Sequence, residues 1–270
     1  QRQMCIRDRL NIQRGTHMLN VDMKGRVAVV SGASGELGRV IARTLADCNA
    51  RVALHYFNGK DRATQLREEI KSKGGEAVTI QADVSNKESV FNLRDEVRAK
   101  LGPADIVVNN AVQQYEWTSV LNQAEEDYES QFKTCVLHNV FMAKAFIPDM
   151  MNKNWRRVVA TNTECTMQCN PNQSAYISGK GGQDRGLRVL ASEVGEYGIT
   201  VNQVAPGWMI SDRFRESPID DSGYVKNVPL GHRGEDQDIA NAVAFLASDL
   251  ASFITGVFLP VAGGNVMPRI

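Results

Sequence analysis

Short apolar runs alternate with amphipathic, helix-like stretches along the chain from residue 24 onward. The apolar runs are unbroken rather than alternating in polarity, which is typical of parallel strands that helices cover on both faces. They predict strands at residues 26–30, 51–56, 77–81, 105–109, 157–161, 199–204 and 257–261. The stretches between them predict helices at residues 37–48, 60–73, 87–101, 125–151, 175–196 and 236–247. This order predicts a three-layer, doubly wound α/β fold with a mostly parallel sheet of about seven strands.

The length of the chain and the absence of breaks in its pattern favour one domain. Its 270 residues could form one large α/β domain or two small ones, and nothing between the strand–helix units resembles a linker or a repeat. We therefore expect a single domain at residues 18–270. Residues 1–17 are basic and polar, lack the apolar core of a secretory signal and do not begin with methionine. We expect them to be a disordered or non-native leader.

The charge and cysteine patterns argue against several classes of partner. The chain has 31 basic and 31 acidic residues, so its charge balance gives no reason to expect nucleic acid or an anionic membrane as a partner. No apolar run approaches the roughly 18 residues of a membrane span. The five cysteines are scattered, without the two-residue gap typical of metal or redox motifs. We expect a cytoplasmic protein with reduced thiols and no metal, whose partner is a small molecule.

A glycine-rich turn follows the first predicted strand. Residues 31–38 read Ser-Gly-Ala-Ser-Gly-Glu-Leu-Gly and lead directly into the first predicted helix. Glycines let backbone N–H groups approach a pyrophosphate, whose negative charge the N-terminus of the helix then favours. A tight turn alone would also explain the glycines, but their place between a strand and a helix favours a Rossmann-type dinucleotide site.

A second pattern indicates acid–base chemistry. Tyr176 and Lys180 are four residues apart and therefore share one face of a helix. A lysine ammonium favours the phenolate and lowers the pKa of a neighbouring tyrosine, which makes Tyr176 a candidate proton donor and acceptor. Thr163 follows a predicted strand 13 positions before Tyr176, where it either hydrogen-bonds a substrate oxygen or only caps the strand. A similar pair, Tyr56 and Lys60, spans an Asn-Gly turn and is interpreted as accidental.

Taken in order along the chain, these motifs resemble those of the short-chain dehydrogenase/reductase family. The glycine turn is similar to the family's T/S-G-x-x-x-G-x-G sequence. The resemblance covers about residues 24–264, and the best local likeness is to the β-ketoacyl-acyl-carrier-protein reductase branch. The further matches are Asp83-Val84, Asn109-Asn110-Ala111, Tyr176-x-x-x-Lys180, Asn202, Pro206-Gly207, Thr255-Gly256 and Gly263-Gly264.

The resemblance implies reversible hydride transfer between a nicotinamide cofactor and a carbonyl or secondary alcohol, with Thr163, Tyr176 and Lys180 as the catalytic residues. It also implies a set of cofactor-binding residues: Gly32, Ser34, Leu37, Gly38, Asp83, Val84, Asn110, Ala111, Tyr176, Lys180, Pro206 and Gly207. Family members usually form homodimers or homotetramers through the helix predicted at residues 175–196 and the preceding long one at residues 125–151. Its four glycines fit a close approach between subunits, with tight packing inside one subunit as the alternative.

The end of the second predicted strand bears on the choice between NADP and NAD. An acidic residue there would accept the ribose 2′-hydroxyl of NAD and repel the 2′-phosphate of NADP, but Tyr56 occupies that place. Lys60 or Arg39 could attract the phosphate, or both could be solvated surface residues. NADP is therefore the favoured cofactor and NAD the alternative.

Two residues depart from the family pattern. Glu36 replaces a glycine, and a carboxylate 4 Å from a pyrophosphate would repel it by about 1–4 kcal/mol. A left-handed backbone at Glu36 would cost about 1–2 kcal/mol more, so we expect Gly35 to carry the turn and Glu36 to point to solvent. Val136 replaces an asparagine that holds a water in a proton relay. Asn139, one turn along, is a possible substitute, and His138 is expected in packing or at the surface.

The two departures support one alternative, a catalytically weak or inactive dinucleotide-binding protein that acts through ligand-dependent interactions. A third function, epimerase or dehydratase chemistry on the same fold, would need a tightly retained cofactor or a different acid–base array.

Loops at the strand ends are predicted to surround the substrate. The expected rim residues are Gln113, Gln114, Tyr115, Glu164, Met167, Gln168 and Trp208. Glu164 could bind a hydroxylated substrate or lie in solvent. Residues 211–231 are polar and contain proline and glycine, which predicts a mobile lid from which Tyr224 or Arg213 could reach inward. The substrate stays open among sugar alcohols, β-ketoacyl thioesters, steroids and simple ketones.

Overall fold

The computed structural model describes residues 21–152, 155–217 and 219–268. Within them, seven strands form one sheet in the order β3-β2-β1-β4-β5-β6-β7, and every neighbouring pair is parallel. The strands are β1 (Val27–Val30), β2 (Arg51–Tyr56), β3 (Ala77–Gln81), β4 (Ile106–Asn109), β5 (Arg156–Thr161), β6 (Ile199–Pro206) and β7 (Phe258–Val261). The predicted doubly wound sheet is confirmed, and it is entirely parallel rather than mostly so. The leader expected at residues 1–17 lies outside the described residues.

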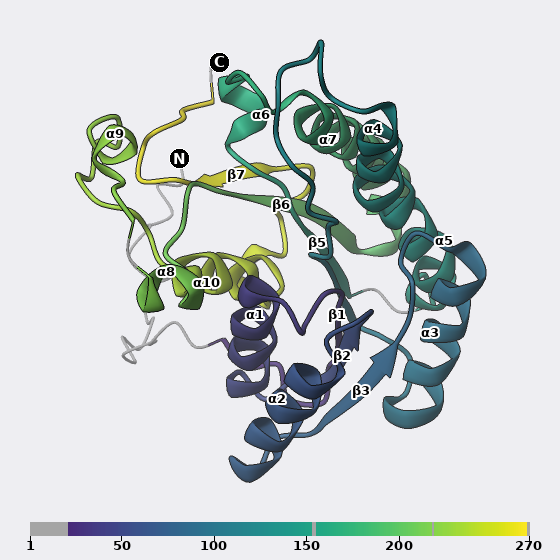
Figure 1. The fold of residues 1–270 in the computed structure, drawn as a ribbon. Helices are drawn as coiled ribbons and strands as arrows, with labels where there is room; N and C mark the ends of the chain where they lie inside the picture. The colour runs from purple at the N-terminus through teal and green to yellow at the C-terminus, as the bar shows by residue number, and fades with distance from the viewer. Residues whose placement is uncertain (1–20, 153–154, 218, 269–270) are drawn as a thin grey trace, which may run out of the picture.

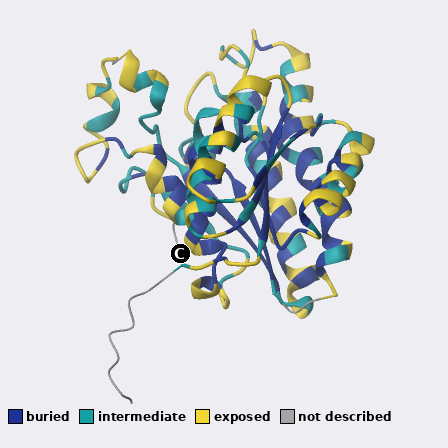
Figure 2. Cartoon of the chain, turned by 90° about the horizontal axis from the view of Figure 1, so that it is seen from below, coloured by how far each residue is buried: buried dark blue, intermediate teal, exposed yellow. Residues whose placement is uncertain are grey.

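Helices cover both faces of the sheet and make the predicted three layers (Figure 1). One face packs against α1 (Glu36–Asp47), α2 (Lys60–Ser72) and α10 (Asp236–Leu246). The other face packs against α3 (Lys87–Leu101), α5 (His138–Met150) and α7 (Ser174–Val194). Strand side chains alternate between the two cores: in β1, Ala28 and Val30 face the first set of helices, and Val27 and Val29 face the second. Figure 2 shows the strands as buried ribbons between exposed helix faces.

Short elements connect these layers. They are α4 (Glu125–Gln131), η2 (Phe132–Leu137), α6 (Cys165–Gln168), η3 (Gly195–Tyr197), α8 (Asp212–Glu216), α9 (Ser222–Val225) and η4 (Asp249–Ala251). Most predicted boundaries are within two residues of the observed ones.

The prediction of one continuous helix at residues 125–151 is wrong in the middle of that range. The chain there runs through α4, then a π-helical turn, η2, and then α5. The imidazole Nδ1 of His138 donates to the Thr134 carbonyl at 3.1 Å, and the Asn139 amide donates to the Cys135 carbonyl at 2.6 Å. In a π-helical turn the backbone hydrogen bonds span five residues instead of four. The two side chains supply additional donors to carbonyl groups of this wide turn. The apolar pattern alone does not reveal such a one-residue bulge.

The strand order reverses direction between β1 and β4. In open parallel sheets, a ligand binds in the crevice outside the carboxyl ends of the strands at such a point. The predicted glycine turn follows β1, and the predicted catalytic residues follow β5, two strands along the same edge.

Candidate active site

One cleft of about 1220 Å³ lies along the carboxyl ends of the strands. Thr163 and every cofactor-binding residue predicted from the sequence line it, from Gly32 and Gly38 at one end to Pro206 and Gly207 at the other. The topology brings these residues together because β1, β3, β4, β5 and β6 all end at this edge of the sheet.

The glycine turn is packed so closely that it excludes side chains at two positions. Gly32 has a φ of +67°, and a Cβ there would stand 3.0 Å from the Ala111 Cα. A Cβ at Gly38 would stand 2.1 Å from the Gly32 carbonyl oxygen and 2.9 Å from the Asn110 amide nitrogen. Helix α1 begins two residues before Gly38, and the N–H groups of its first turn have no partner within the helix. The turn therefore offers backbone donors to an anion in the cleft.

His55, which sequence reasoning missed, fastens the glycine turn to the end of β3. Its Nδ1 accepts from the Gly32 N–H at 2.9 Å, so its Nε2 carries the proton and donates to the Ala82 carbonyl at 3.0 Å. Burial lowers the pKa of His55 to about 4, and the ring is neutral at neutral pH. A histidine inside an apolar strand was the available signal, but its partners are far away in sequence.

Glu36 adopts an ordinary helical backbone. It is the first residue of α1, and the described residues other than glycine that have a positive φ are Asn49, Cys169 and Asn172. The strain considered for a left-handed glutamate is therefore absent, and the sharp turn falls on Gly32 rather than on Gly35 as expected, since Gly35 has a φ of −79°. Glu36 is half-buried and lines the cleft, rather than pointing only to solvent.

The three predicted catalytic residues meet at the other end of the cleft. Thr163 follows β5, and Tyr176 and Lys180 lie in the first two turns of α7. Burial raises the pKa of Tyr176, with the neighbouring Cys165 and Cys135 thiols adding to the rise, while the Thr163 hydroxyl partly offsets it. Tyr176 therefore holds its proton at neutral pH and can donate it, and the lowered pKa expected from its place one turn before Lys180 is not observed.

Aromatic side chains from the loop at residues 112–124 hold Tyr176 in place. The Trp117 ring stacks on the Tyr176 ring with a centroid distance of 5.7 Å and an interplanar angle of 27°. The Tyr115 hydroxyl accepts from the Tyr176 backbone N–H at 2.8 Å. Tyr115 was expected on the rim, but Trp117 was not predicted, because a loop has no periodicity that would indicate its direction. The two residues fix where the phenol stands.

Lys180 is buried, and its ammonium donates to two neutral oxygens. These are the Thr161 carbonyl at 2.6 Å and the Gln183 amide oxygen at 3.2 Å. Burial lowers the pKa of Lys180. Asn139, which was considered as a substitute for the missing relay residue, is engaged elsewhere: its oxygen accepts from the Asn109 amide at 2.7 Å.

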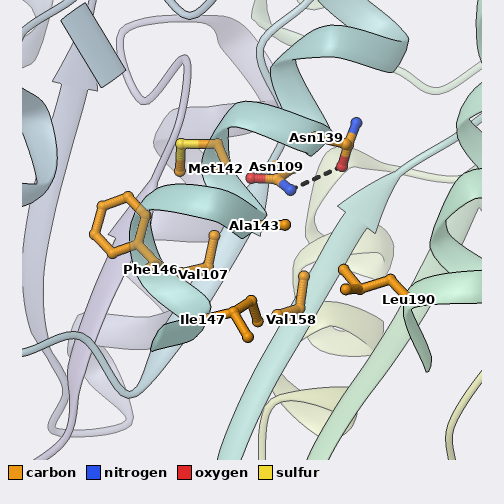
Figure 3. A pocket seen from close by; sticks show the side chains of 9 residues that line it. All are labelled: Val107, Asn109, Asn139, Met142, Ala143, Phe146, Ile147, Val158 and Leu190. Atoms are coloured by element: carbon orange, nitrogen blue, oxygen red, sulfur yellow. Dashed lines mark hydrogen bonds between the residues drawn. The ribbon is translucent and has the colours of Figure 1, made fainter. Parts of the chain in front are cut away.

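Figure 3 shows the Asn109–Asn139 pair at the edge of a second cavity, between β4, β5, α5 and α7. That cavity measures about 10 Å³, which is room for about one water and not for a cofactor. His138 is fully buried, in agreement with a packing role, and burial lowers its pKa to about 3.

Glu164 is 3% exposed, so the alternative that placed it in solvent is wrong. It accepts from the Tyr224 hydroxyl at 2.8 Å and from the Asn265 amide at 3.0 Å, and burial raises its pKa. Tyr224 itself accepts from the Trp208 N–H at 2.8 Å. Glu164 therefore ties the loop after β5 to α9 and to the segment after β7.

The segment predicted as a lid contains the short helices α8 and α9 and closes one side of the cleft through Arg213 and Phe214. Arg233 donates to the carbonyls of Trp208 at 2.8 Å and Met209 at 2.6 Å, just before this segment, and pairs with Asp221 within it at 3.4 Å. Among the remaining rim residues, Gln113 and Gln114 line the cleft, whereas α6 places Met167 and Gln168 outside its lining.

The cations near the glycine turn differ from those expected. Arg39 pairs with Asp212 at 3.1 Å, and neither Arg39 nor Lys60 is among the residues that line the cleft. Arg62, on the first turn of α2, lines the cleft beside Ser34. It was missed because α2 carries several cations, and the sequence does not show which one faces inward.

Within the ranges that the structure covers, no three His, Cys, Asp or Glu side chains are grouped so as to hold a metal ion. No helix in the same ranges is long and apolar enough to cross a bilayer.

A parallel sheet with a glycine turn after β1 and a Thr–Tyr–Lys set across the cleft defines a nucleotide-dependent oxidoreductase of Rossmann type. A family model described as enoyl-(acyl carrier protein) reductase matches residues 32–265. The 3-oxoacyl-[acyl-carrier-protein] reductase of Staphylococcus epidermidis is 35% identical over 241 residues, which cover 89% of this chain and 98% of the relative.

Two solved structures superpose closely. A blue fluorescent protein from a metagenomic library, in complex with NADPH, has a TM-score of 0.85 at 30% identity, covering 91% of this chain and all of the other. A 7α-hydroxysteroid dehydrogenase complexed with NADH and 7-oxoglycochenodeoxycholic acid has a TM-score of 0.86 at 28% identity, covering 92% and 97%. The chain therefore belongs to the short-chain dehydrogenase/reductase family, the NAD(P)-dependent oxidoreductases that act on CH–OH and C=O groups.

Proposed function

We propose that the protein transfers hydride reversibly between NADP(H) and a carbonyl or secondary alcohol, with Thr163, Tyr176 and Lys180 as its catalytic residues. The observation that carries this proposal is that all three line the same cleft as the glycine turn. The relatives support it, because one is named for reducing a 3-oxoacyl group and another was solved with a cofactor and an oxo-steroid.

The residues present fit a dinucleotide. The space that a Cβ at Gly38 would need is already filled, so the turn presents backbone rather than side chains to the cleft. The N-terminus of α1 then faces the place of a pyrophosphate. By the family resemblance, Asp83 and Val84 would hold the adenine, and Asn110 and Ala111 would line the floor beneath the ribose.

The preference for NADPH rests on the charges beside the end of β2. Tyr56 stands where a carboxylate would select NAD, and Arg62 lines the cleft next to the Ser34 hydroxyl. A guanidinium and a hydroxyl are suitable donors for a 2′-phosphate. We therefore assign this role to Arg62 in place of Lys60 and Arg39.

The chain's own contribution to the reaction is to orient the substrate and to move one proton. When bound, NADPH supplies the hydride. The Thr163 hydroxyl hydrogen-bonds the carbonyl oxygen, and Tyr176 donates its phenolic proton to that oxygen as charge develops on it. In alcohol oxidation, Tyr176 takes the proton back. The Lys180 ammonium favours the resulting phenolate.

We further propose that the protein is a homodimer or homotetramer in the cytoplasm. On α7, Gly179 and Gly182 are explained within one subunit, since a Cβ would stand 2.9 Å from the Gln131 carbonyl and from Val136. Gly181 and Gly186 face open space, which suits contact with a second subunit. The four described cysteines are free, which suits a reducing compartment.

The test is a fluorescence titration with NADPH and NADH, followed by an assay of carbonyl reduction at 340 nm. Acetoacetyl-coenzyme A and a 7-oxo bile acid serve as first probes. We expect tighter binding of NADPH than of NADH and turnover of at least one carbonyl probe. Arg62→Met should remove most of the preference for NADPH, while Lys60→Met, its matched control outside the cleft lining, should keep it. Absence of binding at millimolar concentration would refute the proposal and favour a protein whose dinucleotide site Glu36 has disabled.

A further inference from the structure

The catalytic lysine is held in an unusual way for a buried charge. Lys180 is 2% exposed, and no described carboxylate pairs with its ammonium. The two oxygens that accept from it, the Thr161 carbonyl and the Gln183 amide oxygen, are neutral. A buried ammonium without a counter-ion depends on such dipoles to stay charged and in place.

Both the oxygen and the nitrogen of the Gln183 side-chain amide take part in the hydrogen bonds around the Lys180 ammonium. It is 3% exposed and lies one turn after Lys180 on α7. Its Oε1 accepts from the lysine at 3.2 Å, while its Nε2 donates to the Thr161 carbonyl at 3.0 Å. The same carbonyl accepts from the lysine at 2.6 Å. Lys180, Gln183 and the end of β5 therefore form a closed triangle of hydrogen bonds.

The side chain at position 136, on η2, is a valine and offers Lys180 no hydrogen-bond acceptor. The Val136 methyl lies 2.9 Å from where a Cβ of Gly182 would be, so this side chain packs on the backbone of α7. Asn139, one turn further, uses both ends of its amide elsewhere: its oxygen accepts from the Asn109 amide, and its nitrogen donates to the Cys135 carbonyl. The side-chain acceptor for the lysine thus comes from α7 itself.

We propose that Gln183 is a positioning residue that holds the Lys180 ammonium, together with the Thr161 carbonyl, in reach of Tyr176 and of the cleft. The proposal rests on the proposed function for its catalytic consequence, but the hydrogen-bonded triangle itself does not. Gln183 is not itself among the residues that line the cleft, and it acts through its bonds to Lys180 and Thr161, both of which are.

The first test needs no cofactor. The Lys180 ammonium is titrated by NMR in protein with ¹³C-labelled lysine, with the signal assigned by Lys180→Met. Gln183→Met keeps the side-chain length and removes the acceptor, so the lysine should lose its proton at lower pH. Gln183→Glu keeps an acceptor oxygen at the same reach and should move the midpoint to higher pH. The titratable groups that interact with the lysine are Cys135 on η2 and His138 on α5, and Tyr176 lies one turn before it on α7; all three variants retain these groups.

The second test is kinetic. With NADPH and the carbonyl probe found by the screen, Gln183→Met should lower kcat about ten- to a hundred-fold, the size expected for a lost hydrogen bond to a charged group. KM for the probe should change little. Gln183→Glu should recover most of kcat and shift the pH–rate profile in the direction of the lysine midpoint.

A structural control separates positioning from stability. Asn202 is a fully buried amide that donates to the Ile254 carbonyl at 2.7 Å and has no contact with Lys180. Asn202→Leu should lower Tm without moving the lysine midpoint. An unchanged midpoint in Gln183→Met, or shifts of the same sign in the Met and Glu variants, would overturn the proposal. If the wild type reduces no carbonyl, the proposed function fails, whereas the titration still tests the role of Gln183.

Discussion

The close packing around Gly38 predicts that alanine lowers the free energy of unfolding there, whereas alanine at the openly packed Gly195 raises it. Gly38→Ala would place a Cβ 2.1 Å from the Gly32 carbonyl oxygen, 2.8 Å from the Gly32 carbonyl carbon and 2.9 Å from the Asn110 amide nitrogen. Two of these obstacles are backbone atoms, which no rotamer change can move. Overpacking of this kind costs about 1–3 kcal/mol, and we expect a loss near 3 kcal/mol because the turn and α1 must separate.

Gly195→Ala is the matched control. Gly195 follows α7 with a φ of −58° and a ψ of −37°, and nothing lies within 4 Å of its added Cβ. Alanine fits this right-handed conformation, so the free energy of unfolding should rise by about 0.4–1 kcal/mol through the unfolded state.

Urea unfolding of the two variants measures both effects, and a fluorescence titration with NADPH measures the first again. Gly38→Ala should also weaken NADPH binding at least tenfold, while Gly195→Ala should leave it within twofold. Equal changes in stability, or full NADPH affinity in Gly38→Ala, would refute the close-packed turn.

Three further substitutions test the charges of the site and of the helices. Burial raises the pKa of Glu164, so the free energy of unfolding of the wild type should increase as the pH falls through that raised value to about 4.3. Urea unfolding of Glu164→Gln should lack this increase. The same pH dependence in both proteins would contradict the burial of this charge. The Arg43 guanidinium holds the pKa of Glu69 at about 2, so this pair stabilises above pH about 4.3 and is lost as the pH falls towards 2. Because the pair is partly exposed, Glu69→Gln should flatten that acid loss by at most about 1 kcal/mol, and a larger effect would point to other carboxylates. Glu36 lines the cleft, where its carboxylate would repel a pyrophosphate at 4 Å by about 1 kcal/mol in water. Glu36→Gln removes this charge and should tighten NADPH binding up to about fivefold. Weaker binding would show that the carboxylate does not face the pyrophosphate.

The sheet and the cofactor end of the cleft could be predicted from the sequence because their signals are local. Unbroken valine-rich runs mark strands buried on both faces, and a glycine turn between a strand and a helix has one common structural meaning. Gly32 and Gly38 illustrate this, since the close contacts that exclude a Cβ lie within the turn or on the neighbouring strand end.

The contacts that support the proposed catalytic residues could not be predicted in the same way. Trp117 lies in a loop 59 positions before Tyr176, and Tyr224 lies in the short helix α9, 60 positions after Glu164, so neither belongs to a periodic pattern that indicates its direction. Gln183 shares a helix with Lys180, but its direction depends on the Thr161 carbonyl at the end of β5. The π-helical turn η2 depends on the side-chain bonds of His138 and Asn139, which an apolar pattern does not record.

Transfer of deuterium from C4-labelled NADPH to a carbonyl probe tests the proposed reaction most directly. Mass spectrometry of the product from wild type and Tyr176→Phe, with NADPH affinity measured alongside, separates chemistry from binding. We predict one deuterium on the former carbonyl carbon with the wild type, and at least a thousandfold less product with Tyr176→Phe at nearly equal NADPH affinity. Near-normal transfer by Tyr176→Phe would contradict the assignment of Tyr176 as the proton donor.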